Sequence, residues 1–126
     1  FIELAGSTAN GDLATSVGAP AESLDSAKAF VEAYAAAGYK EGYSAYGTYS
    51  YDAANAIIEA LKVSLPSASD ASAARAGTVE ALNSVKFSGA SGEVAFNEFG
   101  DNTSRILTVY KVEGGEWKAA KTEDFQ

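Results

Sequence analysis

The chain has 126 residues, enough for one ordinary domain, and 47% of them are hydrophobic, which indicates a globular protein rather than a disordered one. Asp and Glu outnumber Lys and Arg by 17 to 9, and no basic cluster is present, so nucleic acid is not an expected partner. The sequence holds neither His nor Cys, which excludes disulfides, thiolate chemistry and a hydrolase triad; we therefore expect no enzyme, no metal and no cofactor.

The first 20 residues predict two short elements. Phe1–Gly6 is expected to be the last turn of a helix that Gly6 ends. Leu13–Val17 is compatible with a brief strand. Gly18, Ala19 and Pro20 then predict a connector, because a residue before proline is driven to extended geometry.

A helix is predicted over Leu24–Ala37, with Ser23 as its cap and Gly38 at its end. Its apolar positions fall on one helical face: Leu24, Ala27, Val31 and Tyr34, widened by Phe30. This pattern is typical of an amphipathic helix on a core.

The central helix, predicted over Ser50–Lys62, has the clearest pattern in the chain. An apolar stripe recurs at spacings of three and four residues, which is the period of an α-helix: Tyr51, Ala54, Ile58, Leu61 and Leu65. Ser50 or Thr48 is expected to cap the start, and Asp52 to lie in the first turn, where the helix dipole favours negative charge. Pro66 is expected to stop the helix.

Five tyrosines crowd the approach to this helix: Tyr39, Tyr43, Tyr46, Tyr49 and Tyr51. They admit two interpretations. Either they pack beneath the helix, or one or two of them line a ligand cleft, since a phenol offers an apolar face and a polar tip.

A third helix is predicted over Asp70–Val85, with Asp70 as its cap and Gly77 weakening it by about 1 kcal/mol relative to Ala. Its inner face is expected to carry Ala71, Ala74, Thr78, Leu82 and Val85.

From Lys86 the apolar pattern changes to period two, which predicts strands. The predicted strands are Val94–Phe96, Ile106–Val112 and Trp117–Ala120, with turns at Phe99–Asn102 and Glu113–Glu116. Ile106–Val112 is apolar on both faces and is expected to be covered on both. Lys121–Gln126 is expected to be a frayed polar end.

Motifs for chemistry are absent from the sequence. Gly89–Gly92 is not a phosphate loop, because no Gly-Lys-Ser/Thr follows and the segment leads into a strand. The isolated carboxylates of Asp12, Asp52, Glu98 and Asp101 are expected to serve at the surface or as helix caps.

The order of several motifs resembles one known family. The motifs are Phe30-x3-Tyr34, Tyr51-Asp52-Ala53-Ala54 opening a helix, Ala81-Leu82, Phe87-x-Gly89-x2-Gly92-x3-Phe96-x3-Gly100-Asp101, and Gly115-x-Trp117. Together they resemble the C-terminal part of the solute-binding proteins of branched-chain-amino-acid-type ABC importers. The resemblance implies an α/β chain, three helices plus short strands, that forms a segment of a two-lobed type I periplasmic-binding-protein fold.

In that family two lobes are joined by three hinge crossings and hold the ligand between them. The resemblance implies a late segment of such a protein, divided as follows: Phe1–Thr15, end of the second lobe; Ser16–Pro20, a hinge crossing; Ala21–Phe99, the returning first-lobe segment; Gly100–Ser104, a further crossing; and Arg105–Gln126, closing strands of the second lobe.

The resemblance also implies a site and partners. Tyr46 matches a position where the family often has an aromatic side chain against the ligand, with Thr48 and Tyr49 as weaker neighbours. The implied function is extracytoplasmic capture, in the periplasm or at the cell surface, of an amino acid or related solute for an ABC transporter permease. The upstream part of the protein, or a second copy, would complete the fold. The alternative is a stand-alone α+β interaction or structural domain without a small-molecule role.

Overall fold

A computed structural model describes residues 1–125, which fall into two compact units. One unit combines Phe1–Pro20 with the chain from Arg105 onward, and the other is Ala21–Ser104. The boundaries lie beside the two segments that the resemblance assigns to hinge crossings. Whether the units are the two lobes of a larger protein stays a prediction.

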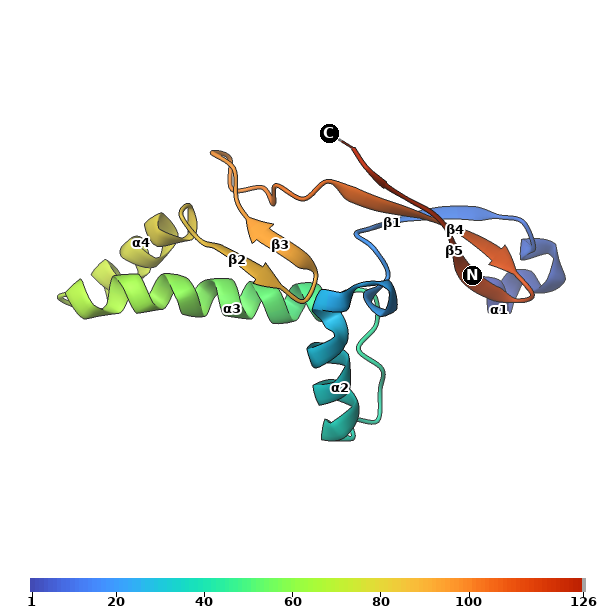
Figure 1. Ribbon diagram of the computed structural model, residues 1–126, viewed down its shortest axis with the longest axis horizontal. Coiled ribbons are helices and arrows are strands. Elements are labelled where there is room, and N and C mark those ends of the chain that lie inside the picture. The colour runs from blue at the N-terminus through green and yellow to red at the C-terminus, as the bar shows by residue number, and fades with distance from the viewer. Residues whose placement is uncertain (126) are drawn as a thin grey trace. The chain divides into compact units, whose positions relative to one another are not determined.

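The first unit is built on an antiparallel sheet in the order β1-β4-β5 (Figure 1). Its strands are β1 (Leu13–Val17), β4 (Ile106–Glu113) and β5 (Glu116–Asp124). Gly114 and Gly115 join β4 to β5 with φ of 65° and 82°, the left-handed geometry that a two-residue hairpin requires, so the predicted turn is confirmed.

The prediction of a frayed end from Lys121 is wrong, because β5 continues to Asp124 and pairs Lys121 with Val109. The strand continues because residues 121–124 pair in register with residues 106–109 of β4, and the Thr122 hydroxyl lies 2.9 Å from that of Thr108. Gln126 lies outside the described residues.

Only one face of this sheet is well covered. Thr108 and Val112 are buried, and the Phe1 ring at the start of α1 (Ile2–Ala5) stacks on Trp117 at 5.9 Å between ring centroids. On the other face Val17, which pairs with Leu107, is 52% exposed. Cover on both faces of β4, as predicted, is therefore not complete among the described residues.

The second unit contains α2 (Lys28–Ala37), α3 (Gly47–Ser64) and α4 (Ala71–Leu82). Two predicted ends are confirmed: Gly38 adopts φ 67° after α2, and the Asp70 carboxylate accepts a hydrogen bond of 2.8 Å from the Ala73 amide. Ser23 does not cap α2, because short 3-10 turns at Ala21–Ser23 and Asp25–Ala27 come first.

The predicted cap of α3 is wrong. The helix begins at Gly47, and neither Ser50 nor Thr48 serves as the capping residue, because Tyr46 occupies that position without a side-chain cap. A tight turn at Ser44, whose φ is 53°, lets the helix start three residues earlier than the polar side chains suggest.

The buried side of α3 is also not the predicted one. The buried residues form what we call the packed row: Thr48, Asp52, Ala56, Ala60 and Ser64. Of the predicted apolar stripe, Tyr51 is 50% exposed, Ile58 49% and Leu65 55%. The packed row is buried because α4 and the hairpin of β2 (Lys86–Gly89) and β3 (Gly92–Ala95), its partners in this chain, approach α3 from that side.

Small residues allow α3 and α4 to come close. A Cβ added at Gly77 would lie 3.3 Å from the Ser64 Cβ, and the Ser64 and Thr78 hydroxyls are 2.8 Å apart. Gly77, which lowers helix propensity, thus serves the packing of the two helices.

A hairpin of β2 (Lys86–Gly89) and β3 (Gly92–Ala95) completes the unit, and Figure 1 shows β2 running along α3. The strand β2 was not predicted, because four residues that include Ser and Gly give a weak strand pattern. The turn that follows is held by Asn97, whose side-chain oxygen accepts hydrogen bonds of 2.9 Å from the amides of Phe99 and Asp101.

Candidate functional site

The start of α3 presents Tyr46, the first predicted site residue. Its side chain is 63% exposed, and its backbone carbonyl accepts the Ser50 amide at 2.9 Å as the helix begins. Tyr46 is therefore fixed by its backbone while its phenol is open to a partner. An exposed aromatic side chain at a helix start is compatible with a recognition role.

The other two predicted site residues lie on the first turn of α3 with different surroundings. Tyr49 is half-buried, three residues after Tyr46 and therefore on the same side of the helix. Thr48 is only 4% exposed and belongs to the packed row, so its side chain faces protein in this unit. All three stay predicted site residues.

Beside this turn lies an aromatic cluster of Phe30, Tyr34, Tyr39, Tyr43 and Tyr51. Phe30 is at its centre, with ring centroids 5.9 Å from Tyr34, 5.5 Å from Tyr43 and 5.4 Å from Tyr51. Tyr34 in turn lies 4.9 Å from Tyr39. Three of the five tyrosines, Tyr39, Tyr43 and Tyr51, thus belong to one aromatic cluster, although Tyr39 remains 66% exposed. Whether any of the five lines a ligand cleft stays a prediction.

One member of the cluster makes a polar contact with an acidic residue. The Tyr43 hydroxyl donates a hydrogen bond to the Glu22 carboxylate. This bond lowers the pKa of Glu22 and raises that of Tyr43 to about 12, because it stabilises the charged carboxylate and the neutral phenol together. The two residues are 21 apart, so no local pattern in the sequence could have predicted the pair.

Asp52 is a second residue whose role the sequence did not predict. Its carboxylate is 2% exposed and accepts hydrogen bonds from the Ala90 amide at 2.8 Å, the Ser91 amide at 2.7 Å and the Ser91 hydroxyl at 2.6 Å. A surface or helix-cap role for Asp52 is therefore wrong: it holds the β2–β3 turn on α3. No local pattern in the sequence predicts this contact, because Asp52 lies 38 and 39 residues from Ala90 and Ser91.

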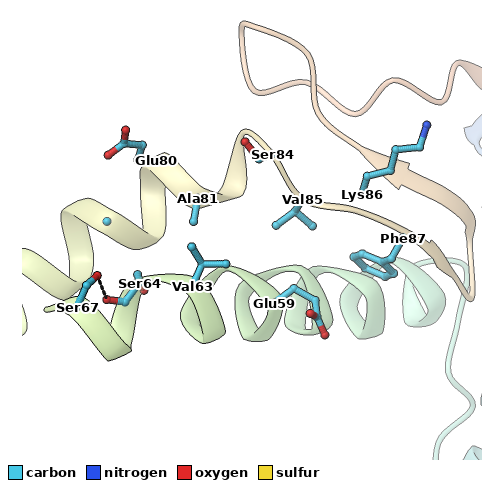
Figure 2. Close-up of a pocket in the computed structure, with 11 residues that line it drawn as sticks. Glu59, Val63, Ser64, Ser67, Glu80, Ala81, Ser84, Val85, Lys86 and Phe87 are labelled. Carbon is cyan, nitrogen blue, oxygen red and sulfur yellow. Dashed lines mark hydrogen bonds between the residues drawn. The ribbon is translucent and has the colours of Figure 1, made fainter.

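Two of the hollows in the same unit are of similar volume. One, of about 500 Å³, is lined by α2, α3 and β2, including Phe30, Tyr51 and Asn55. The other, of about 540 Å³, lies between α3, α4 and β2; Figure 2 shows Val63 and Val85 facing each other across it while Lys86 points away. Tyr46, Thr48 and Tyr49 line neither of these two hollows.

Residues 1–125 contain no group of three acidic side chains placed to hold a metal ion. Within the same residues, no helix has the length and apolar character needed to cross a bilayer.

No protein-family model and no curated protein matches the chain. Among solved structures, the leucine-binding protein LivK of Thermotoga maritima matches 96% of the chain at 26% identity with a TM-score of 0.73, over 33% of its own length. An extracellular ligand-binding receptor from Rhodopseudomonas palustris matches 96% at 25% identity with a TM-score of 0.70, over 37% of its length.

The chain has the fold of a C-terminal segment of ABC transporter substrate-binding proteins. It spans about a third of the length of the solved structures that it matches. A benzoate-bound solute-binding protein of an R. palustris ABC transporter shares this fold, with a TM-score of 0.69 over 96% of the chain and 32% of its own length, at 16% identity. The predicted fold, a fragment of the type I periplasmic-binding-protein architecture, is confirmed, with four α-helices among the described residues because α1 joins the expected three. These matched proteins are binding proteins, not enzymes.

Proposed function

We propose that this chain is part of a protein that captures a small solute outside the cytoplasm for import by an ABC transporter. The observation that carries the proposal is the match to LivK over 96% of the chain at 26% identity. Binding would be non-covalent, in a cleft between two lobes that close about hinges. The two compact units would belong to different lobes, and a permease would be the membrane partner.

The matched proteins suggest the chemical class of the solute. One is named for leucine and another was solved with benzoate, so an amino acid or a related carboxylate is the class proposed here. Tyr46 would contribute its exposed phenol to the cleft, with Tyr49 beside it and Thr48 supporting the turn.

The exposed apolar stripe of α3 supports the proposal that further polypeptide packs against this helix. Ile58 is 49% exposed and Leu65 55%, on a helix whose packed row is already occupied. Exposed apolar surface of this kind marks an interface. We propose that the upstream part of the same protein covers the stripe; pairing with a second copy is the alternative occupant.

Calorimetry on the complete protein with leucine and with benzoate tests the function. Wild type should bind one of them, and Tyr46→Ala should weaken that binding at least about tenfold, the loss of roughly 1.4 kcal/mol or more of contact. Tyr39→Ala is the control, since it removes a ring of similar exposure, 66% against 63%. Binding of neither probe, with a monomeric fold independent of upstream polypeptide, would favour the stand-alone interaction domain.

A further inference from the structure

The position of Tyr46 depends on a turn with little support of its own. The turn runs from Ser44 to Gly47; Ser44 has a φ of 53°, unusual for a residue with a side chain. The backbone hydrogen bond that closes the turn, from the Gly47 amide to the Ser44 carbonyl, is 3.3 Å long, beyond the usual range for such bonds. A turn of this kind needs contacts from outside to keep a single conformation.

Tyr43 supplies such contacts at both ends of its side chain. A Cβ at Gly47 would lie 2.7 Å from the Tyr43 Cβ, so the start of α3 abuts the base of Tyr43. Its ring packs edge-on against Phe30 at 5.5 Å, and its hydroxyl donates to Glu22, which lies in the 3-10 turn Ala21–Ser23.

We propose that Tyr43, through its hydrogen bond to Glu22, is a positioning residue that holds the Ser44–Gly47 turn and so sets where the Tyr46 phenol points. The bond joins the turn to the segment that enters this unit after Pro20. The relevance to solute binding rests on the proposed function, whereas the positioning of the turn does not.

Amide hydrogen exchange on this chain tests the positioning without a solute. Tyr43→Phe keeps the ring and removes the hydroxyl, and it should speed exchange at residues 45–48 about fivefold, the factor for one ordinary hydrogen bond. Tyr39→Phe is the control, because among the described residues its hydroxyl makes no hydrogen bond, and it should leave these amides unchanged. Unchanged exchange in Tyr43→Phe would overturn the proposal.

Substitution of the acceptor separates the hydrogen bond from general loosening. Glu22→Gln keeps a side-chain oxygen that accepts from Tyr43, so its exchange should stay within about twofold of wild type, whereas Glu22→Ala should match Tyr43→Phe. The double variant Glu22→Ala with Tyr43→Phe should add little to either single change, because both remove one bond. Additive effects, or equal effects of Gln and Ala, would contradict the proposal.

Leucine and benzoate titrations on the complete protein connect the turn to binding. Where Tyr46→Ala weakens binding of a probe, Tyr43→Phe should weaken it several-fold, whereas Glu22→Gln, which keeps an acceptor for the Tyr43 hydroxyl, should bind within about twofold of wild type. If Tyr43→Phe binds the probe with wild-type affinity while Tyr46→Ala binds it weakly, the positioning role of Tyr43 is overturned and the proposed function still stands. If wild type binds neither probe, the proposed function loses its support and the exchange experiment still decides the role of Tyr43.

Discussion

The two sides of α3 differ in a way that hydrophobicity alone does not predict. The side buried in this chain is the packed row, which includes a carboxylate and two hydroxyl groups, whereas the apolar stripe is half-exposed. On the packed row, small residues and hydrogen bonds let α4 and the β2–β3 turn approach closely. The apolar stripe follows the helical period but meets no comparable partner among the described residues. The stripe is the surface that the proposed function assigns to upstream polypeptide of the same protein.

The largest expected effect comes from breaking the packed row at Asp52. Asp52→Ala leaves the buried amides of Ala90 and Ser91 without an acceptor, and it should lower the free energy of unfolding by about 2–4 kcal/mol. Denaturant unfolding measures this. Asp70→Ala is the control: it removes an exposed carboxylate with one backbone hydrogen bond and should cost only about 1 kcal/mol. Equal losses would show that the burial of Asp52 contributes nothing.

A second test on the packed row is Gly89→Ala. A Cβ at Gly89 would lie 2.5 Å from the Asp52 carboxylate, closer than real Cβ contacts. The turn and α3 would have to separate, so we expect a loss of about 1–3 kcal/mol by overpacking. Gly92→Ala, where a Cβ has open space but φ is 111°, separates the steric effect from backbone strain. The β2–β3 turn would be looser than described if Gly89→Ala left the unfolding free energy unchanged.

The apolar stripe gives a prediction with two parts. In this chain Ile58 is 49% exposed, so Ile58→Ala should lower the free energy of unfolding by only about 1 kcal/mol. In the complete protein proposed above, where upstream polypeptide covers the stripe, the same change should cost about 2–4 kcal/mol by leaving a cavity. Equal costs in the two settings would show that nothing covers Ile58.

Local signals explain which features the sequence predicted. The Gly38 and Asp70 helix ends and the Gly114–Gly115 hairpin depend on a few adjacent residues, and all are confirmed. The start of α3 was misplaced because its turn uses an uncommon φ at Ser44 in place of a polar cap.

The buried side of α3 could not be predicted, since burial there depends on partners far along the chain. Asp52 is 38 residues from Ala90, and an isolated carboxylate usually lies at the surface. The same limit applies to the candidate site. Tyr46 was predicted through the family resemblance and stays a prediction, whereas the Tyr43–Glu22 bond became visible only in the structure.

A smaller, pH-dependent effect is expected from the Tyr43–Glu22 bond. The pKa of Glu22 is lowered in the folded chain, so its contribution to stability is present above the ordinary pKa of a glutamate and is lost as pH falls through the lowered value. The pKa of Tyr43 is raised from 10.0 to about 12, so its contribution is present below pH 10 and is lost as pH rises from 10 to 12. When the free energy of unfolding is measured against pH, Tyr43→Phe should show neither the fall at acidic pH that comes from Glu22 nor the fall between pH 10 and 12 that comes from Tyr43. A wild-type profile identical to that of the variant would show that the bond is absent in solution.

The smallest expected effect is at Glu59, which follows Ile58 directly. Glu59 pairs with Lys62 at 2.6 Å, but both side chains are largely in solvent, 48% and 63% exposed respectively. Exposed pairs three residues apart on a helix contribute little, so Glu59→Ala should change the free energy of unfolding by less than about 0.5 kcal/mol. Because Glu59 extends from α3 into water, this value should be the same in this chain and in the complete protein, unlike that of Ile58. If the loss of unfolding free energy at Glu59 instead grew in the complete protein as much as the loss at Ile58, the covering polypeptide would lie on a different side of α3 from the apolar stripe.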